Sequence, residues 1–383
     1  MLMIQFISSD FLKQTEVEFY FKDSKIGNEQ ALELGNALKQ CKNLKQLTIQ
    51  IIGMNYISEK GASHLGVGIG SCKNLTNLSI TVFSKFKIGK DGACGIGNGI
   101  GKCLSLEKIN NDIGYLGSQE LGVQLKKCNN LINLIIKLSY NKIGTRDTSF
   151  MLNELSKCHM LESLSLDNYF YIKDQKANDQ NSNKLISLCK EQIGFQRLKT
   201  LNLHLFLPSG IDIGQNSCTN MQNCDLYLFE PQQNFNLLDN SENEIIRGFK
   251  QCANLFSLNI TLNSRNIFTD DRINSFCQEI MNCDKLKKLE INLSEIGLTA
   301  QQVLSISNSL RNLNDLKTLS LNLNENLISQ QAAIQLGIQL SKCQFKIIGL
   351  DISGNSILEG YYTLKRKLFK IIKLIKLSLL ADY

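Results

Sequence analysis

The 383-residue chain contains only three histidines, the residue type that most often acts as a general acid or base: His64, His159 and His204. An enzyme needs several titratable groups that converge on one point, and histidine is the commonest of them. None of the three lies in a catalytic motif, and each stands next to a residue of a recurring apolar pattern. We therefore expect a protein that is not an enzyme, with no catalytic residues and no cofactor.

A glycine-rich stretch, Gly92–Lys102, is the one segment that resembles a phosphate-binding loop. Such a loop needs a glycine five residues before Gly101, where this chain has Ile96. It also needs Ser or Thr after the lysine to bind magnesium, and that position is Cys103. The stretch aligns with helix-spaced segments elsewhere in the chain, so the sequence predicts a helix here.

Thirteen cysteines raise the question of disulfides or a metal site. The number is odd, and most of them occupy one position of a repeat whose neighbours lie a full repeat away. Cys218 and Cys224 have five residues between them and no histidine nearby, which is a poor zinc pattern. We interpret the cysteines as small buried apolar residues in a reducing compartment, and we predict no metal and a cytoplasmic location.

The composition is that of a packed protein: 43% of residues are hydrophobic and 20% are charged. No apolar run reaches the ~18 residues that a membrane-spanning helix requires. The first residues lack a basic leader and Asp10 follows soon after, which argues against a signal peptide.

The strongest signal is a phrase, Cys-Lys-Asn-Leu-x-x-Leu-x-Ile, at Cys41–Ile49 that returns 31 residues later at Cys72–Ile80. Such a period indicates an array in which each copy covers the apolar face of the next. Seven copies place a cysteine six residues before a central Leu or Ile, and in an eighth Cys343 lies seven before Leu350. The seven pairs are Cys41/Leu47, Cys72/Leu78, Cys103/Ile109, Cys128/Leu134, Cys158/Leu164, Cys252/Leu258 and Cys283/Leu289.

Each copy predicts a short strand, a turn and a helix. Apolar residues alternate with period two, as in Leu319–Leu323, which favours a strand with one buried face. Asn-x-Ile follows, as at Asn326, where an amide side chain can bond to unpaired backbone groups of the turn. A helix-spaced stretch comes next, with small residues that would let neighbouring helices approach closely: Gly35, Gly66, Gly122 and Gly337.

The phrase Leu350–Ile357, preceded by Ile347, resembles the leucine-rich repeat L-x-x-L-x-L-x-x-N-x-L. Repeat length and the helical second half resemble the ribonuclease-inhibitor-like subclass, and the phrasing and composition resemble leucine-rich-repeat families of ciliated protists. The resemblance implies an α/β solenoid: a curved horseshoe with a parallel sheet on the concave side and helices on the convex side. Several copies are two residues longer than the consensus, so we expect extended strands or turns.

Thirteen candidate strand centres lead us to expect one domain over residues 1–383, with about thirteen strand-helix units. The first strand is Val17–Phe21 and the last is Leu377–Leu379. Repeats become irregular near residues 167–250, where Asp225–Phe229 reads as an isolated strand. Residues 358–383 form a basic terminal repeat or cap.

Side chains between the buried leucines should form a ladder of small, neutral polar groups on one sheet face, such as Gln46, Thr48 and Gln50. Aromatic residues gather instead in the irregular middle, and interface hot spots are rich in aromatics. We therefore predict a partner-binding patch there, although these aromatics could equally fill gaps left by an imperfect repeat. The candidate residues are Asp167, Tyr169, Tyr171, His204, Tyr227 and Phe229.

The net charge of +7 is concentrated near the end of the chain, where residues 358–383 carry six basic and two acidic side chains. Such a segment could bind a membrane surface or nucleic acid. Leu374, Leu377 and Leu379 keep the repeat register, so we favour a last helix and strand with a solvated outer face. The sequence does not favour a membrane or nucleic-acid partner.

The predicted function is a non-catalytic scaffold or adaptor that binds one or more unidentified proteins through the repeat surface. One alternative is peripheral membrane or nucleic-acid association through the basic C-terminal segment. Another is a regulatory relative of leucine-rich-repeat kinases, because some similar ciliate proteins carry a kinase domain. This chain has no His-Arg-Asp, Asp-Phe-Gly or kinase lysine motif.

Overall fold

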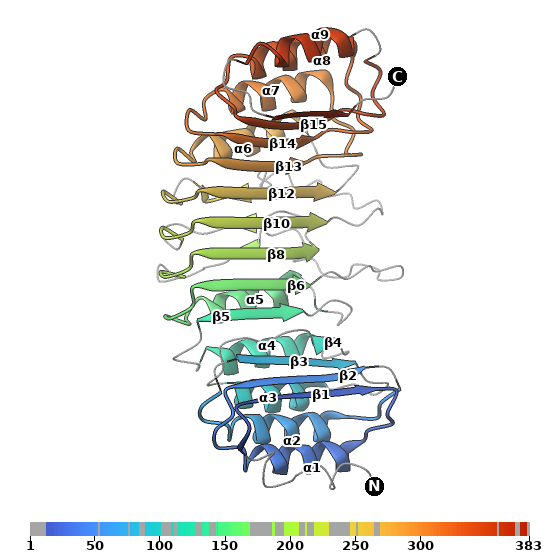
Figure 1. Cartoon of the computed structure of the whole chain (residues 1–383), viewed down its shortest axis with the longest axis vertical. Helices are drawn as coiled ribbons and strands as arrows, with labels where there is room; N and C mark the ends of the chain where they lie inside the picture. Colours follow the sequence, from blue (N-terminus) through green and yellow to red (C-terminus); the bar gives the residue numbers. More distant parts are fainter. Residues whose placement is uncertain are drawn as a thin grey trace. The chain divides into compact units, whose positions relative to one another are not determined.

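The fold is that of a computed structural model of the chain (Figure 1). It divides into two compact units: Met1–Lys176 with Ser187–Leu198, and Ala177–Ile186 with Lys199–Tyr383. We describe each unit by itself. The residues that the structure describes are 13–52, 54–75, 77–83, 89–100, 109–110, 114–126, 132–137, 143, 145–168, 186–187, 195–206, 211–212, 218–229, 246–249, 252–263, 269–357, 360–371 and 376–380.

The first unit alternates strands with helices. Strands β1 to β4 form a parallel sheet in chain order, and β5 pairs in parallel with β6. Each helix packs against the next one in the chain. The elements are β1 (Glu16–Lys22), α1 (Asn28–Leu38), β2 (Gln46–Ile52), α2 (Glu59–Ile69), β3 (Asn77–Phe83), α3 (Gly89–Ile100), β4 (Ile109–Asn110), α4 (Gly114–Leu125), β5 (Asn133–Lys137), α5 (Thr145–Leu155) and β6 (Ser163–Asn168).

The second unit has a larger parallel sheet, in the order β8-β10-β12-β13-β14-β15-β16, with α6 to α9 packed in succession. The two-residue strand β7 (Ile186–Ser187) falls at the division between the units. The remaining elements are β8 (Thr200–Phe206), β9 (Ile211–Asp212), β10 (Asn223–Phe229), β11 (Ile246–Arg247), β12 (Ser257–Asn263), α6 (Asp270–Met281), β13 (Lys288–Asn292), α7 (Ala300–Leu310), β14 (Thr318–Asn322), α8 (Gln330–Leu340), β15 (Ile347–Asp351), α9 (Gly360–Leu368) and β16 (Lys376–Leu380).

The expected period-two strands are confirmed. In β12 the apolar side chains of Leu258, Ile260 and Leu262 are buried, while the residues between them point to the other face. The strands pair residue for residue, so equivalent positions align across the sheet of the second unit. The aligned centres are Leu201, Cys224, Leu258, Leu289, Leu319, Ile348 and Leu377.

Helices α6, α7 and α8 begin at capping side chains, those of Thr269, Thr299 and Ser329, and each helix buries one face. Thr299 accepts a hydrogen bond from the Gln302 N–H, and the Gln302 side chain accepts one from the Thr299 N–H, so two end groups of α7 are satisfied. In each unit the helices lie on one face of the sheet (Figure 1). The core lies between the two layers.

The small helix residues allow close helix packing, as expected. A Cβ on Gly66 would lie 1.9 Å from the carbonyl oxygen of Gly95 in α3, and one on Gly35 would lie 2.5 Å from that of His64. Both distances are shorter than any van der Waals contact. The glycine-rich stretch is therefore helical packing surface: residues 92–100 belong to α3.

The described cysteines at the repeat position are small and mostly buried, as predicted, and Cys343 is half-buried. Cys103 and Cys128 lie outside the described residues. Cys41, Cys72, Cys158 and Cys252 are buried, and the described cysteines carry free thiols. The Cys72 Sγ lies 3.2 Å from the Leu38 carbonyl of the preceding copy, which contributes a weak hydrogen bond between copies. Burial raises the pKa of the Cys72 thiol to about 11.

Asn326 bonds to backbone groups of its own turn, as expected, and also to the preceding copy. Its amide donates to the carbonyls of Leu293 and Leu323, at 2.8 and 3.0 Å, and its Oδ1 accepts from the Leu298 N–H at 2.9 Å. Asn55 makes the equivalent bonds in the first unit, and Asn355 does so for the copy after Asn326. Asn141 lies outside the described residues.

The middle of the chain differs from the sequence interpretation. Segment Asp225–Phe229 belongs to β10, which pairs in parallel with β8 and β12 and so is not isolated. Its centre is Cys224, so Cys218, six residues earlier, occupies the usual cysteine position. The step from Leu201 to Cys224 is only 23 residues, and between β6 and β12 the described residues contain two-residue strands where other copies have helices.

Two further positions correct the sequence analysis. Ile348, and not Leu350, aligns with Leu319. The repeat copy that contains β15 therefore begins at Phe345 and not at Ile347. Ile347 lies on the polar face and is 38% exposed, while Phe345 and Ile348 are fully buried. Phe195 stands six residues before Leu201, where other copies have a cysteine, and it is buried.

The C-terminal segment contains the expected last helix and strand. Helix α9 packs against α8, and β16 pairs with β15 in the same register as the earlier strands. In the part of the chain that the structure describes, no helix is both long enough and apolar enough to cross a membrane.

Candidate functional site

The polar face of the sheet in the second unit presents the candidate site. His204 on β8 lies directly opposite Tyr227 on β10, and their rings are 5.6 Å apart at an angle of 49°. His204 is exposed and Tyr227 is half-buried. The strands fix this pair, because alternate residues of both point away from the buried leucines.

Asp225 lies two residues before Tyr227 and therefore on the same face. Its neighbours across the sheet are Asn202 on β8 and Asn259 on β12. Burial raises the pKa of the Asp225 carboxyl above its ordinary value, and the charge of Glu290 adds to that effect. The charge of His204, a hydrogen bond from Asn259 and the charge of Lys288 act in the opposite direction.

An ion pair on β13 continues the polar surface. The Lys288 Nζ lies 2.7 Å from Glu290 Oε1, and both side chains are more than a third exposed. Glu290 aligns with Asn259 on β12. We call the six residues together the His204 patch: His204, Tyr227, Asp225, Asn259, Lys288 and Glu290.

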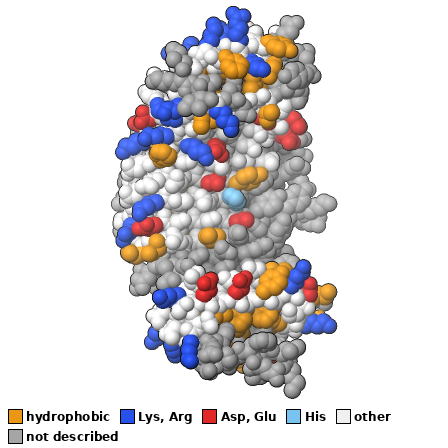
Figure 2. Space-filling view, viewed as in Figure 1, with side chains coloured by type: hydrophobic (Ala, Val, Ile, Leu, Met, Phe, Trp, Pro, Cys, Tyr) orange, Lys and Arg blue, Asp and Glu red, His pale blue; other side chains and the backbone are white. Residues whose placement is uncertain are grey.

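The patch combines one aromatic pair with hydrogen-bond donors and acceptors of both charges. Figure 2 shows isolated acidic, basic and hydrophobic side chains among mostly uncharged groups on the face over these strands. Such a surface suits recognition of a polar polypeptide, with the aromatic pair as the apolar anchor. Among the described residues, no group of three His, Cys, Asp or Glu side chains is placed to hold a metal ion.

The predicted site residues are only partly described. His204 and Tyr227 are brought together, and Phe229 ends β10 opposite Phe206. Asp167 lies on β6 in the first unit, half-buried on the polar face. Tyr169 and Tyr171 lie outside the described residues.

Sequence reasoning missed Asp225, Lys288 and Glu290. All three occupy alternate positions between buried strand residues, so the period-two pattern could have located them. Asp225 was overlooked because β10 was interpreted as isolated. The repeat copy around Leu289 was recognised, but Lys288 and Glu290 were not assigned to the polar face of its strand.

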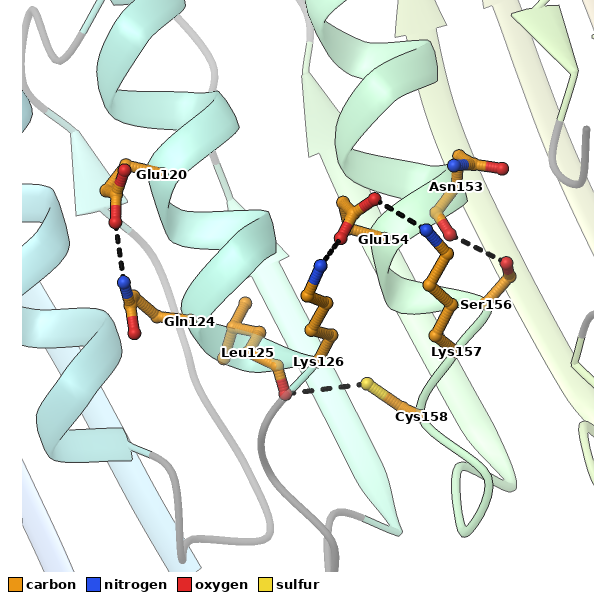
Figure 3. A network of polar contacts seen from close by, with 9 residues as sticks. All are labelled: Glu120, Gln124, Leu125, Lys126, Asn153, Glu154, Ser156, Lys157 and Cys158. Atoms are coloured by element: carbon orange, nitrogen blue, oxygen red, sulfur yellow. Dashed lines mark hydrogen bonds and ion pairs between the residues drawn. The ribbon is translucent and has the colours of Figure 1, made fainter.

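A second polar cluster lies in the helix layer of the first unit. Glu154 of α5 is almost fully buried and forms ion pairs with Lys126, which follows α4, and with Lys157, at 2.8 Å for the latter (Figure 3). Burial opposes the charged form, but the hydrogen bonds and charges of Lys126 and Lys157 hold the pKa of Glu154 below its usual value. Nearby, Gln124 bonds to Glu120 within α4, and the Cys158 thiol bonds to the Leu125 carbonyl. The Lys126–Glu154 ion pair and the Cys158–Leu125 bond connect the end of α4 with the end of α5.

Comparison with known proteins gives little further information. No protein-family model and no curated protein matches the chain. A chain in the crystal structure of the Rad7 and Elc1 complex in yeast is similar at 15% sequence identity. The match covers 86% of this chain and 67% of that chain, with a TM-score of 0.41.

Proposed function

We propose that the chain is a leucine-rich-repeat solenoid of the ribonuclease-inhibitor-like kind that acts as a non-catalytic scaffold for protein partners. The parallel strands in residue-for-residue register, the successive helices on one face and the asparagines after the strands support this fold. We further propose that both units belong to one array and that the protein works in the cytoplasm, where buried free thiols stay reduced.

The observation that carries the proposed function is the His204–Tyr227 pair on a sheet face whose other side chains are mostly polar. A partly exposed aromatic pair bordered by hydrogen-bonding groups has the composition of an interface hot spot. The charged groups around it have partners: Asp225 is hydrogen-bonded to Asn259, and Lys288 is ion-paired with Glu290. This arrangement supports recognition, in which fixed polar groups give specificity.

The test is site-specific photocross-linking in the source cell. A photoreactive phenylalanine analogue replaces Tyr227 in one variant and Thr318, on β14 of the same face, in a matched control. We expect one protein to be cross-linked at position 227 and not at position 318. In the unlabelled chain, His204→Ala with Tyr227→Ala should reduce capture of that protein at least tenfold, while Thr318→Ala should not.

Undiminished capture by the double variant would remove this site from the proposal. Turnover of ATP or another substrate by the purified protein would overturn the non-catalytic role.

A further inference from the structure

Helix α9 combines exposed aromatic residues with basic residues on one surface. Its buried side, formed by Tyr361, Leu364 and Leu368, faces the core. Leu364 lies close to Gly337 of α8, where a Cβ on the glycine would be 2.7 Å from Leu364 Cδ1. The side that faces away from the core is the candidate surface.

Four residues form an outward stripe, which we call the α9 stripe: Tyr362, Arg366, Phe369 and Lys370. They are spaced i, i+4, i+7 and i+8 and so share one side of a helix. The helix ends at Leu368, but the Phe369 N–H still donates to the Lys365 carbonyl at 3.0 Å, so helical geometry continues through the stripe.

The aromatic residues of the stripe are unusually accessible. Tyr362 is 67% exposed and Phe369 is 64% exposed, more than any other aromatic side chain among the described residues. Moving such rings out of water is favourable. The Tyr362 ring lies edge-on to the Tyr361 ring at 5.5 Å, yet the Tyr362 and Phe369 rings both remain largely exposed.

The charge of the surface is uniformly positive. Residues 360–371 contain Lys365, Arg366, Lys367 and Lys370 and no acidic residue, and Lys376 on β16 is exposed. Helix α8, the neighbour of α9, has no charged residue. Lys365 lies 5.7 Å from the Tyr361 ring and is thereby held near the stripe.

We propose that the α9 stripe binds an anionic lipid surface, with Tyr362 and Phe369 at the headgroup level and the cations against lipid phosphates. Aromatic rings at the headgroup level and cations that meet anionic lipids are two features by which protein surfaces bind such membranes. A nucleic-acid backbone would use the cations, but it gives no reason for two exposed rings seven residues apart. The stripe is separate from the His204 patch, so this inference does not depend on the proposed function.

The test is co-sedimentation of the full chain with vesicles of phosphatidylcholine alone or with 30% phosphatidylserine. We expect binding to the anionic vesicles that weakens with salt. Each cation near such a surface is worth about fivefold in binding, so Arg366→Glu with Lys370→Glu should weaken it at least about 25-fold. Tyr362→Ala with Phe369→Ala should weaken it about tenfold or more without changing the salt dependence.

A matched control uses another exposed aromatic residue with a lysine above it. Phe256 is 48% exposed and the Lys287 Nζ lies 5.3 Å from its ring, so Phe256→Ala with Lys287→Glu should leave vesicle binding within twofold. Circular dichroism checks that every variant is folded. The proposal is overturned by absent vesicle binding, by equal binding to neutral vesicles, or by losses no larger than in the control. A nucleic-acid site would give a different pair of results, which would also overturn the proposal. Single-stranded RNA would displace the protein from the vesicles, and the Tyr362→Ala/Phe369→Ala variant would bind RNA and vesicles as well as the unmodified chain does.

Discussion

At the scale of single residues, the asparagines after the strands contribute most clearly to the connection between copies. Asn326 is buried and satisfies backbone groups on both its own turn and the preceding one. A buried polar backbone group without a partner is costly, so each such side chain stabilises two copies at once.

We predict that Asn326→Ala lowers the free energy of unfolding by about 2–4 kcal/mol, because it leaves the Leu298 N–H and the Leu293 carbonyl without this partner. Urea denaturation followed by circular dichroism measures the loss. Asn314→Ala, at an exposed position, is the control and should cost less than about 0.5 kcal/mol. Equal effects of the two substitutions would contradict the role assigned to Asn326.

The residue scale is also where the candidate site was hardest to predict. The polar positions of β2 and β12 follow from the alternation of apolar residues, and the burial of every second side chain confirms them. The pairing of His204 with Tyr227 depends on which residues of β8 and β10 align across a 23-residue step. Spacing within the chain does not determine that alignment, because it differs from the usual step of about thirty.

At the scale of elements, the helices are held together by close packing and by the Glu154 cluster. Glu154 is charged although buried, because Lys126 and Lys157 compensate it. Removing one partner of such a group leaves a charge in a poorly solvated place, which is strongly unfavourable.

The lowered pKa of Glu154 predicts a pH dependence. The stability that its ionised form contributes is fully present above about pH 5 and is lost as the pH falls through the unfolded value of about 4.3 and then through the lower folded one. We expect Glu154→Gln to destabilise the first unit at pH 7 and to flatten the loss of stability between pH 5 and pH 3. Thermal melts over this range measure the effect, with Glu18→Gln at an exposed position of β1 in the same unit as the control. Curves of equal slope for both variants and the unmodified chain would contradict the prediction.

The elements also show why part of the fold escaped the sequence analysis. Strand-turn-helix copies with a Leu or Cys at fixed spacing were recognisable from Cys41 to Cys158 and again from Cys252. Between them, Phe195 replaces the cysteine, Cys224 replaces the central leucine, and a 23-residue copy is too short for an eleven-residue helix like those of other copies. Strand β10 still forms in this copy because it pairs with β8 on one side and with β12 on the other.

At the scale of the whole molecule, each unit consists of copies that pack mainly against the copies next to them in sequence. Stability in such a protein depends on how many neighbours a copy has. Strand β13 has β12 and β14 on its two sides, whereas β16 ends the sheet order.

We therefore predict that Leu289→Ala in β13 lowers the free energy of unfolding by about 2–5 kcal/mol, because the side chain is fully buried. Leu379→Ala in β16 should cost about 1 kcal/mol, since Leu379 is only half-buried. Urea denaturation of the two variants provides the comparison. A larger loss at Leu379 than at Leu289 would be inconsistent with stability that follows the number of neighbouring copies.

Because the parallel strands pair residue for residue, the side chains on the polar face stand at fixed distances from one another. Neighbouring strands present equivalent side chains about 4.8 Å apart, and positions along one strand repeat about every 6.7 Å. An α-helical ligand lying across the strands advances about 5.4 Å per turn, so it falls half a step out of phase after about four strands. A ligand that crosses more of this face than that must therefore be extended or irregular, and its length sets how many strands it can match.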